Sequence, residues 1–421
     1  MAKNQIITVV YKGMEVGRVG YDPNRRKASF QYNPGFLMQE PFKKLFPYVI
    51  RKTKSVQVFS EFEGDTFRGL PPMIADSLPD MFGNIVFKEW LETGQKDINA
   101  ITPLEQLTYV GSRAMGALEF FPAKELDADI TINLDEITEV VKKVLDVKTA
   151  VKEKNFSNEA LFNIFKIGTS AGGARPKILV SENKKTGHLI AGDIETSADY
   201  NHYLIKLGVD NELYSKEVIE YVYYQMATTA KIDMMPSKLI DNLHFATLRF
   251  DRQNGEKQHI LTASGITGWD MKNPEHAAYE NLFRLALDLS LPQKDIEMLF
   301  RRMVFNIVFA NTDDHLKNFS FIYNDNANKW NLAPAYDLTY PLDALKKYLR
   351  TSRAMSVNGK RVDIQLDDIL KTADLFTVKN AKGVIRQVVE TATQFRLWCL
   401  EHHIPVKVID AVERDFVVME V

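Results

Sequence analysis

The segment Asn311–Asp337 reads N-T-D-D-H-L-K-N-F-S-F-I-Y-N-D-N-A-N-K-W-N-L-A-P-A-Y-D, and the fold prediction rests on it. An apolar run leads into several ionisable residues that begin at Asp313. The apolar residues 319–323, a turn-rich stretch and a return through Trp330 predict a β-hairpin that brings Asp337 back towards them. Ionisable groups placed so closely between apolar segments are costly to bury unless they bind something, so the segment predicts a ligand site.

The spacing within this segment is typical of phosphoryl transfer. Five positions separate Asp313 from Asn318, which is the separation of Asp and Asn in the kinase catalytic-loop motif. Such a site needs a carboxylate that accepts the proton of the attacking hydroxyl, and oxygen ligands that hold Mg²⁺ on the phosphates. We therefore predict Asp313 as the catalytic base and Asn318 with Asp337 as magnesium ligands. The alternative is that these residues only cap turns, because a short motif has a high false-positive rate.

His315 lies between the predicted catalytic and metal-binding residues. Magnesium prefers oxygen ligands to imidazole nitrogen. We expect His315 to form hydrogen bonds or contact phosphate rather than bind the metal.

A second candidate element is the run G-T-S-A-G-G-A-R-P-K at residues 168–177. Glycine lets backbone N–H groups approach phosphate oxygens, and Arg175 with Lys177 adds positive charge. The run matches neither G-x-G-x-x-G nor G-x-x-x-x-G-K-[ST], so a flexible surface loop is the alternative interpretation.

A lysine within an apolar strand is the third candidate. Lys206 lies in the predicted strand 203–207, where a buried ammonium needs an anion. It could contact phosphate, with Glu220 of the following predicted helix as its orienting partner. The alternative is a side chain that reaches back to solvent.

The composition is that of an ordinary globular protein, with 45% hydrophobic and 26% charged residues. The net charge of −2 gives no overall basicity to favour nucleic acid. The basic intervals 346–361 and 379–386 could contact DNA backbone, although a solvated charged face is the alternative. The one cysteine, Cys399, excludes an intrachain disulfide and fits a cytoplasmic protein. We find no signal-peptide pattern and no apolar run near the ~18 residues of a membrane span.

The pattern of strands and helices predicts three parts, 1–125, 126–250 and 251–421. The first is a small α/β unit that opens with a hairpin around Lys12-Gly13-Met14 and contains a helix capped by Thr102. The second is β-rich. The third is mostly helical and ends in two predicted helices, 381–400 and 405–420.

Together these motifs resemble the HipA family, the serine/threonine-protein kinase toxins of bacterial type II toxin–antitoxin systems. The resemblance is carried by the Gly-rich run, L-I-K-L at 204–207, R-F-D-R at 249–252, T-D-D-H-L-K-N at 312–318 and A-Y-D at 335–337. It implies an α+β, bilobal, protein-kinase-like fold with ATP in the cleft. The β-rich N-lobe would carry an appended N-terminal module, and the C-lobe would be all-α.

The resemblance also implies roles for individual residues. Asp313 would be the catalytic base, Asn318 and Asp337 would hold Mg²⁺, and the Gly-rich run would be autophosphorylated at Ser170, which would expel that loop and switch the kinase off. Two positions depart from the family pattern, Leu248 in place of a polar hinge residue and Asp314 in place of a small residue. Nucleotide contacts are expected from Gly172, Gly173, Ala174, Arg175, Pro176, Lys177, Lys206, Leu248, Arg249, Phe250, His315, Lys317, Asn318, Tyr336 and Asp337.

Members of this family bind a helix-turn-helix antitoxin, HipB, and the complex sits on operator DNA. Some phosphorylate an aminoacyl-tRNA synthetase, such as glutamyl-tRNA synthetase. The same partners are therefore expected here as implications of the resemblance. Two alternatives remain open: a kinase that acts on a lipid or small metabolite, because the Asp–Asn–Asp pattern does not select the acceptor, and a non-catalytic co-repressor module.

Overall fold

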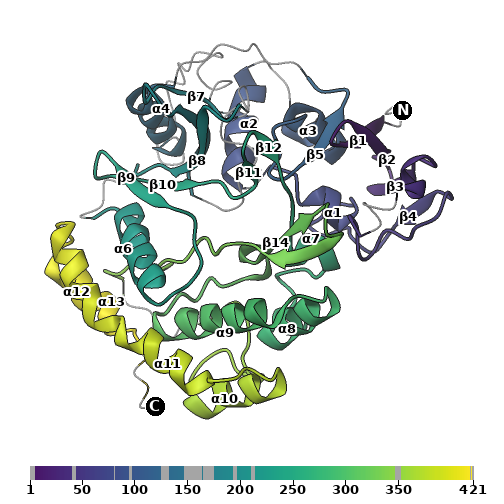
Figure 1. The fold of residues 1–421 in the computed structure, drawn as a ribbon. Helices are drawn as coiled ribbons and strands as arrows, with labels where there is room; N and C mark the ends of the chain where they lie inside the picture. The colour runs from purple at the N-terminus through teal and green to yellow at the C-terminus, as the bar shows by residue number, and fades with distance from the viewer. Residues whose placement is uncertain are drawn as a thin grey trace.

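The structure is a computed structural model. It describes residues 5–39, 44–79, 81–93, 97–124, 132–146, 164, 175–192, 197–209, 214–346, 352–417 and 419. Most of the predicted Gly-rich run, including Ser170, Gly172, Gly173 and Ala174, lies outside the described residues. In Figure 1 the two larger sheets occupy the upper part of the molecule and the long helices of the C-terminal half occupy the lower part.

The N-terminal sheet has five antiparallel strands in the order β4-β3-β2-β1-β5. Its hairpin closes with Tyr11 paired to Met14, and the two turn residues Lys12 and Gly13 have φ of 48° and 76°. Two left-handed turn residues are the geometry that matches the twist of paired strands, so the predicted hairpin is confirmed. The strands are β1 (Gln5–Tyr11), β2 (Met14–Asp22), β3 (Lys27–Tyr32), β4 (Gln57–Phe59) and β5 (Leu118–Phe121).

One helix beside this sheet begins where the sequence predicts it. Helix α3 (Pro103–Val110) begins at Thr102, whose hydroxyl accepts a hydrogen bond of 3.1 Å from the backbone N–H of Glu105. This cap and the proline at the first helical position confirm the predicted start. The remaining helical elements of this region are η1 (Phe36–Met38), α1 (Pro72–Ala75), α2 (Met81–Thr93), η3 (Ile98–Ala100) and α4 (Leu134–Asp146).

A second five-stranded sheet, in the order β7-β6-β8-β10-β9, forms the N-lobe. Buried side chains of this sheet pack with those of α2 and α4, including Phe87, Val141 and Ile205. Packing therefore crosses the predicted boundary at residue 125. The elements are β6 (Lys177–Asn183), β7 (Leu189–Ala191), β8 (Tyr200–Lys206), α6 (Lys216–Thr229), β9 (Ser237–Ile240) and β10 (His244–Leu248).

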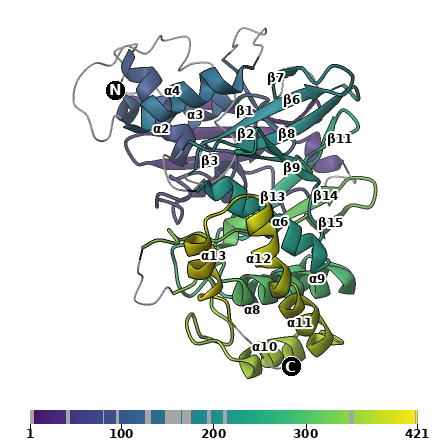
Figure 2. The ribbon, with the colours of Figure 1, turned by 90° about the vertical axis from the view of Figure 1, so that its left-hand side faces the viewer.

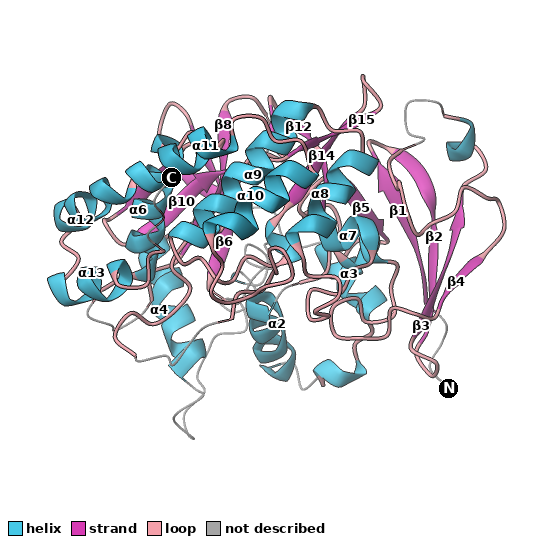
Figure 3. Cartoon of the chain, turned by 90° about the horizontal axis from the view of Figure 1, so that it is seen from below, coloured by secondary structure: helices cyan, strands magenta, loops and turns pink. Residues whose placement is uncertain are grey.

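The C-terminal half is mostly helical (Figure 3). Its helical elements are α7 (Ala263–Thr267), α8 (Tyr279–Asp288), α9 (Gln293–Val308), η4 (Leu316–Asn318), α10 (Leu366–Leu375), α11 (Ala381–Glu390), α12 (Ala392–Glu401) and α13 (Val406–Glu413). The predicted helix 381–400 breaks at Thr391, where the hydroxyl bonds to the carbonyl of Val388 at 2.7 Å. Such a bond back to the preceding turn competes with helix continuation. The predicted helix 405–420 ends at Glu413, and α10 was not predicted.

The C-lobe is not all-α, because it also contains strands. The predicted hairpin forms from β14 (Ser320–Asn324) and β15 (Lys329–Leu332), and β13 (His259–Thr262) pairs with β14 as a third strand. A short ribbon of β11 (Arg252–Gln253) and β12 (Glu256–Lys257) precedes this sheet. The pairing of β13 with a strand so distant in the sequence leaves no local pattern, which explains why sequence periodicity did not reveal it.

The N-terminal module packs directly on the C-lobe, with α1 beside α7 in Figure 1, and Figure 2 shows the sheets above helices α8 to α11. Helix α1 lies against α7, and the carboxylate of Asp76 accepts two hydrogen bonds of 2.8 Å from the backbone N–H and hydroxyl of Thr262. Helix α7 in turn contacts η4. The module therefore supports the part of the C-lobe that holds the predicted site. None of the described helices is long and apolar enough to cross a membrane.

Candidate active site

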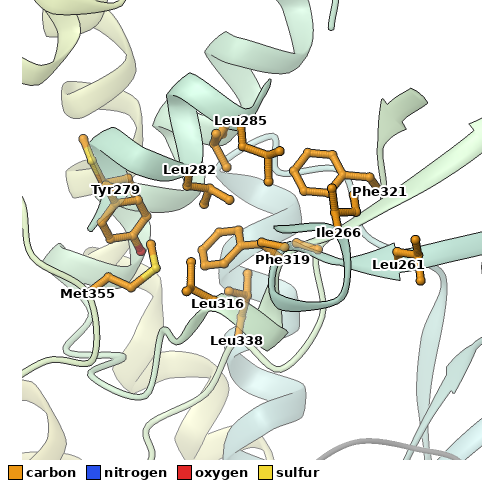
Figure 4. Close-up of a cluster of buried hydrophobic side chains, with 14 of the residues drawn as sticks. Leu261, Ile266, Tyr279, Leu282, Leu285, Leu316, Phe319, Phe321, Leu338 and Met355 are labelled. Carbon is orange, nitrogen blue, oxygen red and sulfur yellow. The ribbon is translucent and has the colours of Figure 1, made fainter. Parts of the chain in front are cut away.

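The site is built around residues 311–318, which we call the aspartate loop. Helix α9 ends at Val308, and Ala310 with φ of 52° turns the chain into the loop. Leu316 and Phe319 are buried among C-lobe side chains, as Figure 4 shows. This apolar packing fixes the loop while the side chain of Asp313 remains 64% exposed. Asp313 is thus held in place and accessible, as a group that meets a substrate must be.

Asn318 turns its amide towards the loop backbone. Its Nδ2 donates a hydrogen bond of 2.8 Å to the carbonyl oxygen of Asp313. An amide has both a donor and an acceptor end. With the nitrogen held this way, Oδ1 is the end that can serve as a cation ligand.

The hairpin brings Asp337 back to this loop, as predicted. Tyr336 donates a hydrogen bond of 2.8 Å to the carbonyl of Lys317 and shares one of 2.5 Å with the hydroxyl of Ser320. The amide of Asn311 lies 3.5 Å from the carbonyl of Asp337. Asp337 itself has φ of 57°, the left-handed region, which costs energy for a residue other than glycine. Strain of this kind is found most often at functional sites.

Lys206 lies across the lobes from the hairpin and joins them. It is 6% exposed, and its Nζ lies 2.6 Å and 2.8 Å from the two carboxylate oxygens of Glu220 on α6. It also bonds to Oδ1 of Asp337. The expectation that Glu220 orients Lys206 is therefore confirmed, and the alternative of a side chain that reaches solvent is excluded.

The charges of this triad set the pKa values of its members. Burial opposes ionisation of Asp337, but Lys206 and Lys177 outweigh it and hold the pKa of that carboxyl well below its usual range. Burial likewise opposes charge on Lys206, yet Asp337 and Glu220 raise its pKa. Burial raises the pKa of Glu220 to about 7, and the negative charge of Asp337 contributes to this. Lys206 and Asp337 are thus the charged pair, while Glu220 gains a proton most easily.

The pKa of Asp313 is shifted in the opposite direction from that of Asp337. Partial burial of the Asp313 carboxyl raises its pKa, His315 opposes the shift, and the negative charges of Asp337 and Asp314 add to it. The Nε2 atom of His315 lies 4.0 Å from Oδ1 of Asp313. A carboxylate with a raised pKa is a better proton acceptor. The two aspartates therefore have the different environments that a base and a metal ligand require.

The described end of the Gly-rich run lies close to this triad. Lys177 is buried and pairs with Lys206 in the register of β6 and β8. The Nη2 atom of Arg175 lies 2.7 Å from Oε1 of Glu217, at the start of α6. Arg175, Pro176 and Lys177 are the predicted nucleotide contacts of this run that the structure describes. Lys177 places its charge at the start of β6, and Arg175 places its charge beside α6.

Charged residues of the hinge segment 248–252 form ion pairs with one another, a structural role that the sequence did not indicate. Arg249 is buried and directs its guanidinium to Asp251 at 2.9 and 3.0 Å, and Arg252 bonds to the same carboxylate at 2.7 Å. The backbone N–H groups of Leu248 and Arg249 bond to other carbonyls of the N-lobe. Phe250 instead stacks on Tyr336, with ring centroids 5.8 Å apart, and so forms an aromatic pair next to Asp337.

A cavity of about 200 Å³ borders the hinge on another side. Leu248, Arg249 and Asn254 contribute to its wall, but Lys206 and Asp337 do not. We therefore do not identify this cavity with the candidate active site.

The described part of the basic interval 346–361 contains both buried and exposed charged groups. Arg353 is buried, and Arg361 donates to the carbonyls of Pro274 and Ala277 at 2.9 and 2.8 Å. Lys360 is paired with Asp368 at 2.8 Å. The two arginines are used inside the C-lobe, so the expectation of a solvated charged face is wrong for them, whereas the side chains of Lys346 and Lys360 are 72% and 48% exposed.

Sequence reasoning assigned no role to Asp314, which the structure buries completely. Its carboxylate accepts hydrogen bonds from Tyr279 at 2.7 Å and from the guanidinium of Arg353 at 3.1 Å. The only sequence signal was a second acidic residue beside Asp313. Nothing local pointed to its partners, which lie far away in the chain.

Two parts of the chain match described protein families. Residues 7–121 match the HipA N-terminal domain, and residues 169–395 match the HipA-like C-terminal domain. The second match alone covers more than half of the 421 residues. The chain therefore belongs to the HipA family.

Curated relatives match over shorter stretches. "Putative kinase Y4dM" of Sinorhizobium fredii (strain NBRC 101917 / NGR234) is 29% identical over 154 residues, 36% of each chain. A "Putative kinase" of Haemophilus influenzae is 33% identical over 107 residues, which are 22% of this chain and 29% of the relative. The chain thus spans about a third of the length of these relatives.

A solved structure matches over almost the full length. It is HipA from the Shewanella oneidensis MR-1 toxin–antitoxin complex with HipB and operator DNA, with a TM-score of 0.60, 13% identity and 97% of each chain covered. At this identity the likeness establishes the fold. It confirms the α+β, bilobal, protein-kinase-like architecture with an appended N-terminal module.

Proposed function

We propose that this protein is an ATP- and Mg²⁺-dependent serine/threonine-protein kinase that acts as the toxin of a type II toxin–antitoxin module. The observation that carries the proposal is the convergence of Lys206, Asp337 and the loop Asp313–Asn318 from three distant parts of the chain. If Lys206 and Asp337 formed an ion pair with a purely structural role, no accessible carboxylate such as Asp313 would be needed beside it. Here Asp313 remains open while its neighbours are fixed.

The residues present fit a Mg²⁺–nucleotide complex. Asn318 offers an amide oxygen, and Asp337 offers a carboxylate whose side chain is 29% exposed. The described residues contain no group of three or more His, Cys, Asp or Glu that could hold a metal. Two protein oxygen ligands suit Mg²⁺, which keeps waters and takes its other ligands from phosphates. The bound complex would supply the phosphoryl group and neutralise its charge.

The chain's own residues would divide the remaining work. Asp313 would orient the acceptor hydroxyl and accept its proton, and Lys206 would contact phosphate while Glu220 orients it. Phe250 and Tyr336 would contact the adenine. His315, Lys317 and Arg175 would add polar contacts to the nucleotide, and Ser170 would be the autophosphorylation site.

The family and the solved relative support the proposed partners. The Shewanella HipA is in a complex with HipB and operator DNA, which supports a HipB-like antitoxin and operator DNA for this chain. An aminoacyl-tRNA synthetase, such as glutamyl-tRNA synthetase, is the proposed substrate on the strength of the family resemblance alone.

The test uses the full-length protein with γ-labelled ATP and Mg²⁺, alone and with cell extract. Wild type should label itself and an extract protein, and Asp313→Asn should lose labelling by about 10²- to 10⁴-fold, the usual contribution of a general base. Ser170→Ala should lose only self-labelling. Asp374→Asn, which changes an exposed carboxyl on α10, is the matched control. A wild type that labels no protein, but does label a lipid or metabolite, would replace the protein-kinase proposal by the alternative kinase.

A further inference from the structure

We propose that Asp314 and Arg353 form a clamp, independent of any phosphorylation, that positions Asp313 for phosphoryl transfer. The proposal rests on the proposed function of the same site. Nε and Nη2 of Arg353 each lie 3.1 Å from Oδ2 of Asp314, and Nη2 also donates to the carbonyl of Asn311 at 3.0 Å. One guanidinium therefore holds two points of the aspartate loop, on either side of Thr312 and Asp313.

Backbone groups next to the Asp314–Arg353 pair also form hydrogen bonds between the two segments. The N–H of Met355 donates to Oδ1 of Asp314 at 3.3 Å, and the N–H of Ala354 donates to the carbonyl of Thr312 at 2.8 Å. Segment 353–355 thus runs directly beside the aspartate loop. In Figure 4 Met355 and Tyr279 lie on the same side of this core, next to Leu316. The position of Asp313 is consequently fixed through its two neighbours in the chain.

The network continues from Asp314 to the backbone of Asp337. Tyr279 donates to Asp314 at 2.7 Å, and Asn306 donates to the Tyr279 hydroxyl at 3.0 Å. The Nδ2 atom of Asn311 donates to Oδ1 of Asn306 at 2.9 Å and also lies 3.5 Å from the carbonyl oxygen of Asp337. Each bond is directional, so the chain sets where Asp337 lies relative to Asp313. The clamp therefore links the proposed base to the proposed metal ligand.

The energetics favour positioning over stability as the purpose of this pair. The side chains of Asp314 and Arg353 are 0% and 6% exposed. A buried ion pair is often no more stabilising than apolar residues of the same volume, and its best-attested use is to fix one arrangement among several. Misplacement of a reacting group by about 1 Å can cost a hundredfold in rate. A directional buried pair next to Asp313 fits that need.

The Asp314–Arg353 pair joins an anion and an arginine, as a phosphorylated activation segment does, but the anion here is a carboxylate. In many kinases a segment that follows the metal-binding aspartate is ordered when its phosphate pairs with arginine. Here the segment after Asp337 supplies the arginine, and the aspartate loop supplies a permanent anion in Asp314. Asp314 thus supplies to Arg353 the negative charge that a phosphate supplies in such kinases.

Three variants test the clamp in the full-length protein. Asp314→Asn removes the anion, Arg353→Lys keeps the charge but loses the two-pronged contact, and Tyr279→Phe removes one hydroxyl. Lys360→Met is the matched control, because it breaks the ion pair to Asp368 in the same C-lobe region without touching the loop. We expect kcat to fall at least tenfold in Asp314→Asn, less in the other two variants and not in the control. Affinity for Mg²⁺–AMP-PNP by calorimetry should change less than twofold, because Lys206 still holds the side chain of Asp337.

A second measurement tests the clamp without relying on activity. Hydrogen–deuterium exchange of peptides that cover residues 311–318 should be faster in the three variants than in wild type or Lys360→Met. Folded variants with wild-type kcat and wild-type exchange would overturn the clamp. So would a loss of kcat and nucleotide affinity in equal measure. If Asp314→Asn does not fold, Arg353→Lys and Tyr279→Phe decide. A wild type without phosphotransfer refutes the proposed function, whereas exchange alone still decides the clamp.

Discussion

Lys206 and Glu220 form a buried ion pair in which Nζ lies 2.6 and 2.8 Å from the two carboxylate oxygens. The exposed fractions of the two side chains are 8% and 5%. Lys206 therefore compensates a carboxylate that water cannot reach, and it does so while it also bonds to Asp337. This double use explains why the lysine is tolerated in an otherwise apolar strand.

The first prediction concerns removal of this lysine. Lys206→Met removes the cation that lies between Glu220 and Asp337, so the free energy of unfolding should fall by about 3–5 kcal/mol at pH 8. Burial already raises the pKa of Glu220 to about 7. A raised carboxyl pKa means that the folded state binds the proton more readily, so the loss should shrink as the pH falls below 7. Urea unfolding at pH 8 and pH 5 measures both values.

Lys238→Met is the control for this experiment. It breaks a pair of 2.8 Å with Glu182 in the same sheet, but the Lys238 side chain is 43% exposed. Exposed pairs contribute about 0–1 kcal/mol. An equal loss in both variants, or a loss in Lys206→Met that does not depend on pH, would contradict the buried triad.

The second prediction concerns Asp251, which holds the hinge together. Its carboxylate bonds to Arg249, to Arg252 and to the backbone N–H of Gly116 in the N-terminal module at 2.7 Å. Asp251→Asn leaves two buried guanidinium groups undercompensated and should cost about 3–5 kcal/mol in urea unfolding. Despite burial, the two arginines hold the pKa of Asp251 well below its usual range. Its contribution is present above the unfolded pKa and is lost as the pH falls towards the folded one.

Asp241→Asn is the matched substitution, because Asp241 is an exposed turn residue with φ of 54° that asparagine tolerates. Its effect should stay within about 0.5 kcal/mol. If the two variants had similar stability, Asp251 would not be the residue that ties the hinge to the N-terminal module.

The third prediction concerns the stacked pair Phe250 and Tyr336. If these rings contact adenine, Phe250→Ala should weaken nucleotide binding by about 1–3 kcal/mol, the usual contribution of a base stacked on an aromatic ring. The value of kcat at saturating ATP should change little, because a contact with adenine contributes to binding of the nucleotide and not to the reacting phosphoryl group. Phe250→Tyr keeps the ring and is the control. A fall in kcat without a change in affinity for Mg²⁺–AMP-PNP would assign the rings another role.

Local patterns in the sequence were sufficient to predict much of the fold. The turn at Lys12 and Gly13 and the cap at Thr102 depend on adjacent residues, so the sequence indicated them correctly. The spacing of Asp313 and Asn318 and the hairpin that returns Asp337 are also local. The family resemblance then predicted how the lobes are combined.

The features of the fold and the site that the sequence did not predict depend on contacts between residues far apart in the chain. Arg353 lies in a basic interval, and charge patterning predicts solvent for such a residue, yet its partner Asp314 draws it into the core. The pairing of β13 with β14 likewise joins strands separated by three α-helices and the aspartate loop. Ser170 lies outside the described residues, so its phosphorylation stays a prediction.

The last prediction concerns acid stability at the contact between the N-terminal module and the C-lobe. His259 on β13 is 1% exposed and lies 3.3 Å from the carbonyl of Leu45, with the Tyr11 ring 5.6 Å and the Trp330 ring 5.5 Å away. Burial lowers the pKa of His259 to about 4, although Asp325 opposes the shift. The unfolded chain binds a proton at a pKa of about 6.5, whereas the folded chain resists it.

The sign of the effect follows from this difference. Between about pH 6.5 and 4 the unfolded state binds more protons than the folded state, so stability rises with pH in this window and is lost on acidification. The loss attributable to His259 should approach about 3 kcal/mol at pH 4 relative to pH 7. In His259→Gln the slope of unfolding free energy against pH should flatten, whereas exposed His188→Gln should leave it unchanged. Equal slopes in wild type and His259→Gln would show that other groups control acid unfolding of this interface.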